Sequence, residues 1–293
     1  MSLNNILIYR ERLNNKRSRE MKNHFLRIIG ACLLFVLSLN AKALVINGCV
    51  IEAYTQCEGA NLDLASLSNA DLYGSNLSNA SLNGANLNNA DLFDANLQSA
   101  DLSYADLVDA DLTNAHFYLA NLSWASLRNA NLSGGYLVDA NLTNTHFSNA
   151  NLTSANLQNA GLMNLNFVNA DLTGANLANA NLTNADLQDA DLSSTNLYSA
   201  NLINADLFDT NLSNANLQYA NLSDALFSPN TIFTGATYNQ STIFPASLCL
   251  GCDFDPVAAG MIFVSEVPLP AGIYLFISGV VGLGLVKNRN ILS

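Results

Sequence analysis

Four of the five cysteines of this chain, all except Cys32 in the N-terminal segment, are the residues whose chemistry depends most on their spacing. Cys49 and Cys57 lie close together, and Cys249 and Cys252 form a C-x-x-C pair. A C-x-x-C pair is typical of a redox motif, of half a zinc site or of a structural disulfide. The sequence has no second C-x-x-C and no nearby histidine to support a zinc site. It also lacks the alternation of strands and helices that would support a thioredoxin-like domain. We therefore expect structural disulfides, and four cysteines allow three pairings.

A repeat of five residues sets the positions of most other polar side chains. Thirty-four consecutive pentapeptides run from residue 60 to residue 229, with the form A-[N/D]-L-x-x, positions 1 to 5. Position 3 is Leu in thirty copies and Phe at Phe117, Phe147, Phe167 and Phe227, and position 1 is Ala in twenty-eight. This period fits neither a helix nor a strand. The chain must therefore form a coil that stacks on itself.

The repeat, as in residues 85–89 (ANLNN) and 105–109 (ADLVD), resembles the pentapeptide repeat family. The resemblance implies an all-β fold, a right-handed quadrilateral parallel β-helix with one pentapeptide per side and four per coil. Leu and Ala are then expected to point inward. Asn, Asp, Ser and Gly at the remaining positions tolerate tight turns and can bond their own backbone. Stacked ~4.8 Å apart, the coils would form a rod of roughly 40 Å.

The rod separates the two cysteine pairs, since one lies before it and the other after it. Disulfide-bonded residues have Cα atoms within about 7 Å of each other. The fold implied by the resemblance therefore favours the local pairings Cys49–Cys57 and Cys249–Cys252.

Residues twenty positions apart should lie above one another in a column. His116 and His146 are six repeats apart, so they should face opposite sides and share no metal. No Ser-His-Asp cluster can be assembled from sides so far apart.

One column is acidic and is the sequence's candidate cation site. Carboxylates ~4.8 Å apart repel one another, so weak Ca²⁺ binding would relieve the column, and the alternative is a solvated acidic face. The column contains Asp71, Asp91, Asp111, Asn131, Asn151, Asp171, Asp191 and Asn211.

Position 1 is Leu165 where most copies have Ala, and Phe167 follows it. Phe147 lies one coil earlier, so its ring should stack on that of Phe167. We expect the most distorted coil in this region.

The charge distribution separates the rod from the ends of the chain. Between Ala43 and Lys287 the one basic residue is Arg128, against twenty-one Asp and Glu. Proteins that bind nucleic acids use Lys and Arg to contact the phosphates, so this excess of acidic residues argues against nucleic acid as a partner.

Residues 1–43 have the features of a leader and signal peptide, with Met21 the better start. Lys22 and Arg27 precede an apolar run at 28–39, and an A-x-A cleavage site follows at 41–43. An uncleaved membrane anchor is the alternative interpretation. We expect an N-terminal cap at 44–59 and a C-terminal cap and linker at 230–266, because the open strand edges of a solenoid need covering.

Residues 267–293 resemble a PEP-CTERM sorting signal of the VPLPA form. The motif is followed by an apolar stretch at 272–286 and a basic end. The resemblance implies cleavage by an exosortase-type enzyme, after a stage with membrane-type helices at both ends of the chain. A plain C-terminal anchor is the alternative. The motif consists of Val267, Pro268, Leu269, Pro270 and Ala271.

Together these features favour a non-catalytic, exported structural or interaction rod, sorted to the cell surface and held in extracellular polysaccharide. No cofactor or enzymatic activity is expected. The alternative is an acidic DNA mimic that protects a topoisomerase such as gyrase, in line with some pentapeptide repeat proteins. The expected signals for export disfavour that alternative, because gyrase is cytoplasmic.

Overall fold

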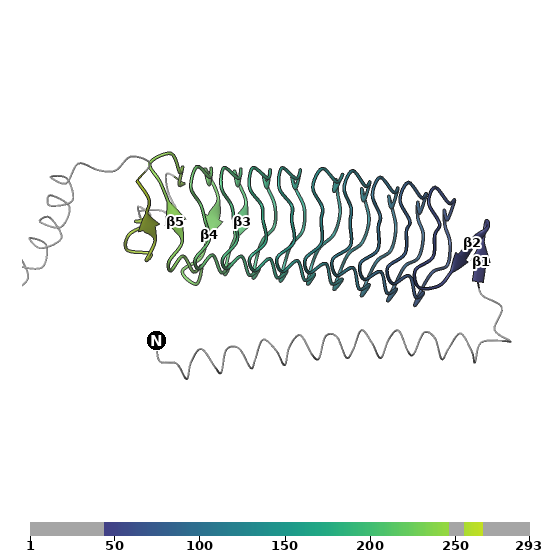
Figure 1. Ribbon diagram of the computed structural model, residues 1–293. Coiled ribbons are helices and arrows are strands. Elements are labelled where there is room, and N and C mark those ends of the chain that lie inside the picture. Colours follow the sequence, from purple (N-terminus) through teal and green to yellow (C-terminus); the bar gives the residue numbers. More distant parts are fainter. Residues whose placement is uncertain (1–43, 246–254, 266–293) are drawn as a thin grey trace, which may run out of the picture. The chain divides into compact units, whose positions relative to one another are not determined.

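The computed structural model describes residues 44–245 and 255–265, which form a coiled solenoid (Figure 1). Six short strands are assigned: β1 (Leu44–Ile46), β2 (Cys49–Ile51), β3 (Asp206–Leu207), β4 (Leu226–Phe227), β5 (Thr237–Tyr238) and β6 (Ile262–Phe263). The rest of the sheet structure consists of single bridges between successive coils. The expected signal peptide, Cys249, Cys252 and the sorting segment lie outside the described residues. The described part contains no helix suited to crossing a membrane.

Coils pair in parallel with a register of twenty residues, which is four pentapeptides per coil. Position 2 forms the bridges, as in Asp71 to Asp91 and Asn76 to Asn96. The expected four-sided arrangement is therefore present. The four sides carry columns of position-2 residues, and we name them the first to fourth columns by their first members within residues 60–229, which are Asn61, Ser66, Asp71 and Asn76.

Every backbone N–H of a typical pentapeptide has a partner, and residues 90–94 illustrate the pattern. The N–H groups of positions 2, 3 and 5 bond to neighbouring coils, with N···O distances of 2.9, 2.7 and 2.9 Å. The N–H of Ala90 closes a turn with Leu87. The N–H of Phe93 is bonded by the Asp91 side chain, whose Oδ1 accepts it at 3.1 Å. Asn or Asp at position 2 thus completes the hydrogen bonding of the backbone.

Position 5 lies in the left-handed region in every copy from Leu64 to Asp224. The φ angles of the non-glycine residues there run from +54° at Asp94 to +64° at Trp124. A positive φ at the third residue of a hydrogen-bonded four-residue turn is the requirement of a type II turn, which Gly and Asn meet most easily. The corner geometry therefore explains why Asn is common at position 5.

The core is a single row of side chains on the inside of each face. Every Leu at position 3, from Leu62 to Leu222, is at most 1 % exposed. Most Ala residues at position 1 are equally buried, and where Thr replaces Ala its hydroxyl bonds to a carbonyl of the preceding coil. Thr145, for example, donates to the Leu122 carbonyl at 2.8 Å. The inward orientation of Leu and Ala is confirmed, and the side chains of position 2 are mostly half-buried in their ladders.

The ladder is interrupted in the middle of the solenoid, near the expected distortion. The rings of Phe147 and Phe167 stack as predicted, with centroids 5.1 Å apart and planes 5° apart. In the described part of the first column, every residue is bridged to the next one except Asn141, which is not bridged to Gly161. No backbone hydrogen bond joins residues 140–144 to residues 160–164. The buried Leu165 occupies a space that elsewhere holds Ala, so its added volume separates these coils. A wider gap is visible in the middle of Figure 1.

The solenoid is longer than the repeat pattern. Ile232, Thr237 and Ile243 continue the ladder from Asn211, Asn216 and Asn221. The ladder of bridges therefore continues into the expected C-terminal cap, because extra residues in this segment shift its period without breaking the pairing. At the other end, Gln56 already pairs with Asn76. Residues 55–59 (TQCEG) are a divergent pentapeptide in which Cys57 takes the place of the core Leu.

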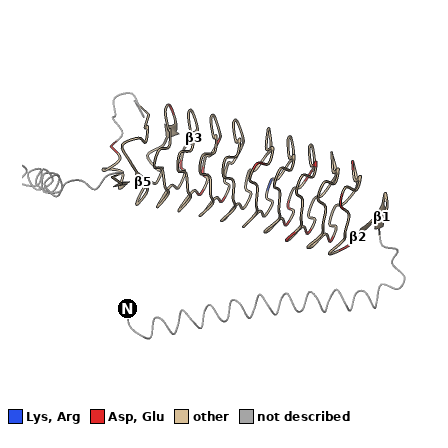
Figure 2. Ribbon diagram, turned by 45° about the horizontal axis from the view of Figure 1, so that its top comes forward, with Lys and Arg blue, Asp and Glu red and all other residues tan. Residues whose placement is uncertain are grey.

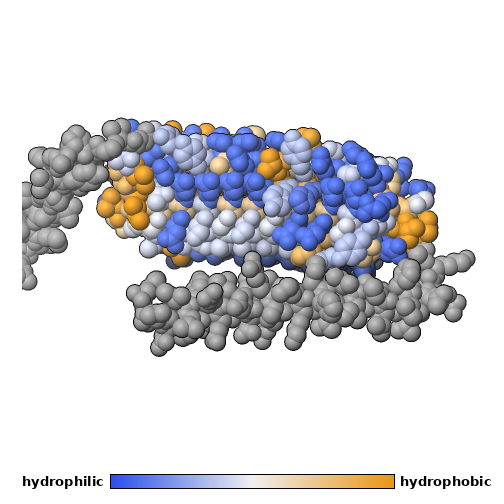
Figure 3. Space-filling model, viewed as in Figure 1, coloured by the Kyte–Doolittle hydropathy of each residue, from blue (hydrophilic) through white to orange (hydrophobic). Residues whose placement is uncertain are grey.

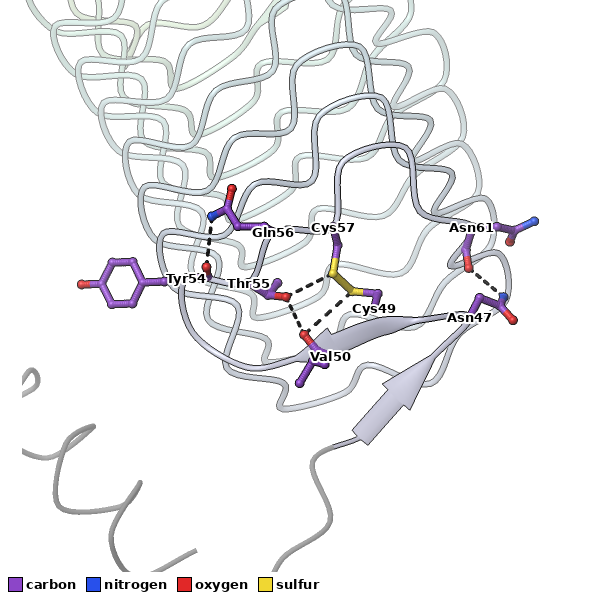
Figure 4. The surroundings of a disulfide bond; sticks show 8 residues. All are labelled: Asn47, Cys49, Val50, Tyr54, Thr55, Gln56, Cys57 and Asn61. Atoms are coloured by element: carbon purple, nitrogen blue, oxygen red, sulfur yellow. Dashed lines mark hydrogen bonds between the residues drawn. A yellow bond between two sulfur atoms is a disulfide. The ribbon is translucent and has the colours of Figure 1, made fainter.

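Each end of the solenoid is covered by a short strand. At the N-terminal end β1 pairs with β2. Asn47 and Gly48 connect the two strands, and both have a positive φ, as a tight hairpin turn requires. Cys49 and Cys57 form a disulfide with a Cα–Cα distance of 5.4 Å, and both are at most 5 % exposed (Figure 4). At the C-terminal end β6 adds in parallel to β5. The side chain of Met261 is buried there beside them.

We predict that Leu107→Asp unfolds the solenoid or lowers its free energy of unfolding by several kcal/mol, because it places an unpaired charge in the core. Leu107 has no exposed surface. Urea denaturation followed by circular dichroism measures the change. Asp106→Asn is the control, since Asn serves at the same position in many copies. A stable Leu107→Asp protein would contradict the core assignment.

The double change Cys49→Ser and Cys57→Ser should destabilise the first coils. Removing a disulfide that closes a loop of this length lowers the free energy of unfolding by about 2.5 kcal/mol. Hydrogen exchange should then rise in the N-terminal coils and stay unchanged in the C-terminal ones, with Glu58→Gln as the control. Peptide mapping under non-reducing conditions tests the pairing itself. A crosslink from Cys49 to Cys252 within one chain would contradict local pairing.

Candidate functional site

The outer surface of the solenoid holds the candidate site residues, since the interior is filled by apolar side chains. Acidic residues are distributed along its length, and one basic residue, Arg128, lies among them (Figure 2). Figure 3 shows a hydrophilic band that runs along the coils, with apolar side chains gathered at both ends of the described solenoid.

Ladders of position-2 side chains run along the outside of the solenoid. In most places where an Asn follows an Asn or Asp in a column, its Nδ2 donates to the Oδ1 of the residue one coil earlier. Asn196 bonds to Asn176 at 3.0 Å in this way, and Asn216 bonds to Asn196 at 3.2 Å. Each Oδ1 also accepts the N–H of position 4, so one oxygen serves both the turn and the ladder.

The acidic column predicted from the sequence is assembled by the fold. Bridges join Asp71 to Asp91, Asp91 to Asp111, and Asp171 to Asp191. In all five, Oδ1 accepts the N–H of the residue two positions later, at 2.8–3.2 Å. Within residues 44–245 and 255–265, no three His, Cys, Asp or Glu side chains form a group suited to holding a metal ion. The carboxylates therefore have a structural task in the turns, and weak Ca²⁺ binding along the column stays a prediction.

Asp191 is the carboxylate of this column with the clearest electrostatic effect. Partial burial raises the pKa of its carboxyl, but hydrogen bonds from Ser193, Asn211 and Thr173 outweigh burial and hold the pKa below its ordinary value of 3.8. The bonds to Ser193 N and Asn211 Nδ2 measure 2.8 and 3.1 Å. The carboxylate form is thus favoured by the folded state.

The two histidines lie on different columns, as expected. His116 belongs to the fourth column and stacks on Tyr136, with ring centroids 4.7 Å apart. His146 belongs to the second column, between Ser126 and Asn166. The separation predicted from the repeat is therefore present, and the histidines do not meet.

A group of exposed rings at the corners was missed by the sequence reasoning. Tyr104 and Trp124 both occupy position 5 of the first column's side, and their rings stack in nearly parallel planes, 6° apart. They are 62 % and 55 % exposed. Their spacing of twenty residues is the signal that could have paired them before the structure was known.

We predict that Asp191→Asn reduces the acid sensitivity of the solenoid. A carboxyl whose folded pKa is depressed stabilises the fold above its unfolded pKa, and this stability is lost as the pH falls through the folded pKa. The melting temperature should therefore fall further in wild type than in Asp191→Asn when the pH is lowered from 5 to 2. Thermal unfolding monitored by circular dichroism measures this difference. Asn196→Ala, in the neighbouring column, is the control. Parallel curves for wild type and Asp191→Asn would contradict the assignment.

Comparison with known proteins agrees with the geometry. The family model for pentapeptide repeats matches in eight copies, over residues 60–98, 95–134, 136–164, 166–202 and 190–228. A search of curated proteins gave no significant match.

Among solved structures, the chain is similar to HetL, a pentapeptide repeat protein involved in heterocyst differentiation regulation in the cyanobacterium Nostoc sp. strain PCC 7120. The two share 30 % identity over 73 % of this chain and 85 % of HetL, with a TM-score of 0.40. A pentapeptide repeat protein from the thylakoid lumen of Arabidopsis thaliana shares 37 % identity over 37 % of this chain and 69 % of that chain, with a TM-score of 0.18. QnrB1, a plasmid-mediated fluoroquinolone resistance protein, shares 14 % identity over 78 % of this chain and 95 % of that chain, with a TM-score of 0.26. With its repeat, its twenty-residue register and the family model that matches more than half of it, the chain belongs to the pentapeptide repeat family.

Proposed function

We propose that the chain is a non-catalytic interaction rod that is exported and sorted to the cell envelope or the extracellular matrix. The observation that carries the proposal is the buried Cys49–Cys57 disulfide at the N-terminal cap. Disulfides persist in oxidising compartments and are rare in the cytosol, so this bond supports export. The regular outer surface, built from amide and carboxylate ladders, suits binding along a line rather than chemistry at a point.

Both ends of the chain support export through their sequence. An apolar run with an A-x-A site precedes the solenoid, and a VPLPA motif with an apolar and basic tail follows it. Membrane-type helices in these two segments belong to the proposal, as do the membrane and the exosortase-type enzyme as partners. The mature chain would then extend from about residue 44 to about residue 270.

Protection of a topoisomerase such as gyrase is the competing function. The acidic surface between residues 44 and 265 favours it, since a DNA mimic needs carboxylates in place of phosphates. Adding the purified protein to a gyrase supercoiling assay, with and without a quinolone, separates the two proposals. An exported rod should leave supercoiling unchanged.

The double change Pro268→Ala and Pro270→Ala should block maturation. Proline favours an extended backbone, and without it a helix would be able to continue through the motif and hide the cleavage site. The mean hydropathy of the tail hardly changes, so insertion into the membrane should be intact. Intact mass in cell and medium fractions, with and without the exosortase gene, measures the outcome. Pro229→Ala is the control.

If the mature protein keeps Lys287 and Arg289 in both strains, the tail is a simple anchor. If the protein stays in the cytosol, export itself is wrong, and the topoisomerase proposal gains.

A further inference from the structure

The rings of Tyr104 and Trp124 occupy a corner position that few bulky side chains occupy. Their φ angles are +60° and +64°, in the left-handed region that favours Gly and Asn. Burial does not offset this cost, because both side chains are more than half exposed. These two rings therefore need a reason other than stability.

Further apolar side chains border the same part of the surface. Tyr118 and Leu119 lie at the corner where the side ending in Trp124 begins, and they are 44 % and 53 % exposed. Leu119 also has a positive φ. Tyr104, Tyr118, Leu119 and Trp124 thus flank both ends of one side over two successive coils, and we name this surface the ring ledge.

Polar groups lie between these corners. Asp101 and Asn121 are the position-2 residues of the two coils, and Asn121 donates to the Oδ1 of Asp101 at 2.9 Å. The same Oδ1 accepts both the N–H and the hydroxyl of Ser103, whereas no residue in the described part of the chain bonds to Oδ2 of Asp101. One carboxylate oxygen beside the rings is therefore left for a ligand.

The charge around the ring ledge selects among ligands that stack on rings. Asp106 and Asp109 follow Tyr104 on the next side, and Arg128, also on that side, is the one basic residue between residues 44 and 265. Nucleotides and acidic sugars would meet net repulsion here. A cation gains from the carboxylates and from the faces of Trp and Tyr.

A sugar with a free amino group meets all of these conditions. The C–H face of a pyranose ring packs flat on an aromatic ring, its hydroxyls reach amides and carboxylates at its edge, and its ammonium suits the acidic surroundings. The two rings stack with centroids 6.2 Å apart, and each side chain keeps more than half of its surface exposed for such a contact. We propose that the ring ledge binds a polysaccharide that contains unacetylated amino sugars. The proposal rests on the proposed function in one respect, since an exported rod is what would meet such a polymer.

Trp124 is the single tryptophan of the chain, so its fluorescence reports on the ring ledge alone. The full chain is titrated with an oligomer of β-1,4-linked glucosamine, and polygalacturonate serves as the acidic comparison. We expect a saturable change in Trp emission with the glucosamine oligomer and none with polygalacturonate.

The variants Tyr104→Asn and Asp101→Asn should each weaken binding about fivefold, the effect of losing one ring or one charge at an exposed site. Asn is common at both positions of the repeat, so the fold is kept, and thermal melting verifies this. Tyr219→Asn, which removes a ring from position 5 of another side, is the matched control and should bind like wild type.

Absence of binding, equal binding of polygalacturonate, or unchanged affinity in Tyr104→Asn would each overturn the proposal. The fully acetylated oligomer should bind less tightly, and equal affinity would overturn the role of the ammonium. Because the titration uses purified protein, its failure leaves export untouched. A failure of export in the localisation experiment would likewise leave a positive titration standing.

Discussion

The structure depends on one constraint: each coil must satisfy its backbone through the coils beside it. Three of the five N–H groups of a typical pentapeptide bond to neighbouring coils, one closes the corner, and one is bonded by the side chain at position 2. The corner closes only if position 5 has a positive φ. The apolar core then follows, because this backbone turns positions 1 and 3 inward in every copy. Leu and Ala are selected by the space that remains inside.

The same constraint makes the surface polar without making it reactive. An Oδ1 at position 2 is occupied by a turn and, where Asn follows, by a ladder. Asp and Asn are interchangeable for the turn, so the number of carboxylates can vary while the fold stays the same. A strongly acidic chain can therefore arise from structural positions. The acidic column is thus weaker evidence for metal binding than its composition suggests. A residue that departs from the preference of its position, such as an aromatic ring at position 5, is stronger evidence for a function.

Strict periodicity made most of the solenoid predictable. The register, the inward Leu residues, the stack of Phe147 on Phe167 and the separation of His116 from His146 all follow from a twenty-residue coil. The ends did not follow, because there the period is broken: the segment after Pro229 stays in the ladder despite its extra residues, and Cys57 replaces a core Leu. The exposed rings were missed for a different reason. Position 5 is defined by backbone angle, and the sequence pattern leaves that position unspecified.

The interruption between Asn141 and Gly161 has a mechanical consequence for the solenoid. In a stack where each coil contacts its neighbours alone, cooperativity passes from coil to coil through the interfaces. An interface with fewer hydrogen bonds transmits less of it, so the coils on either side can behave as two cooperative blocks. Under a pulling force along the solenoid axis, the interface between the coils of Asn141 and Gly161 would open first. The coils before it would then stay folded while the coils after it move, which gives the solenoid a defined point of compliance.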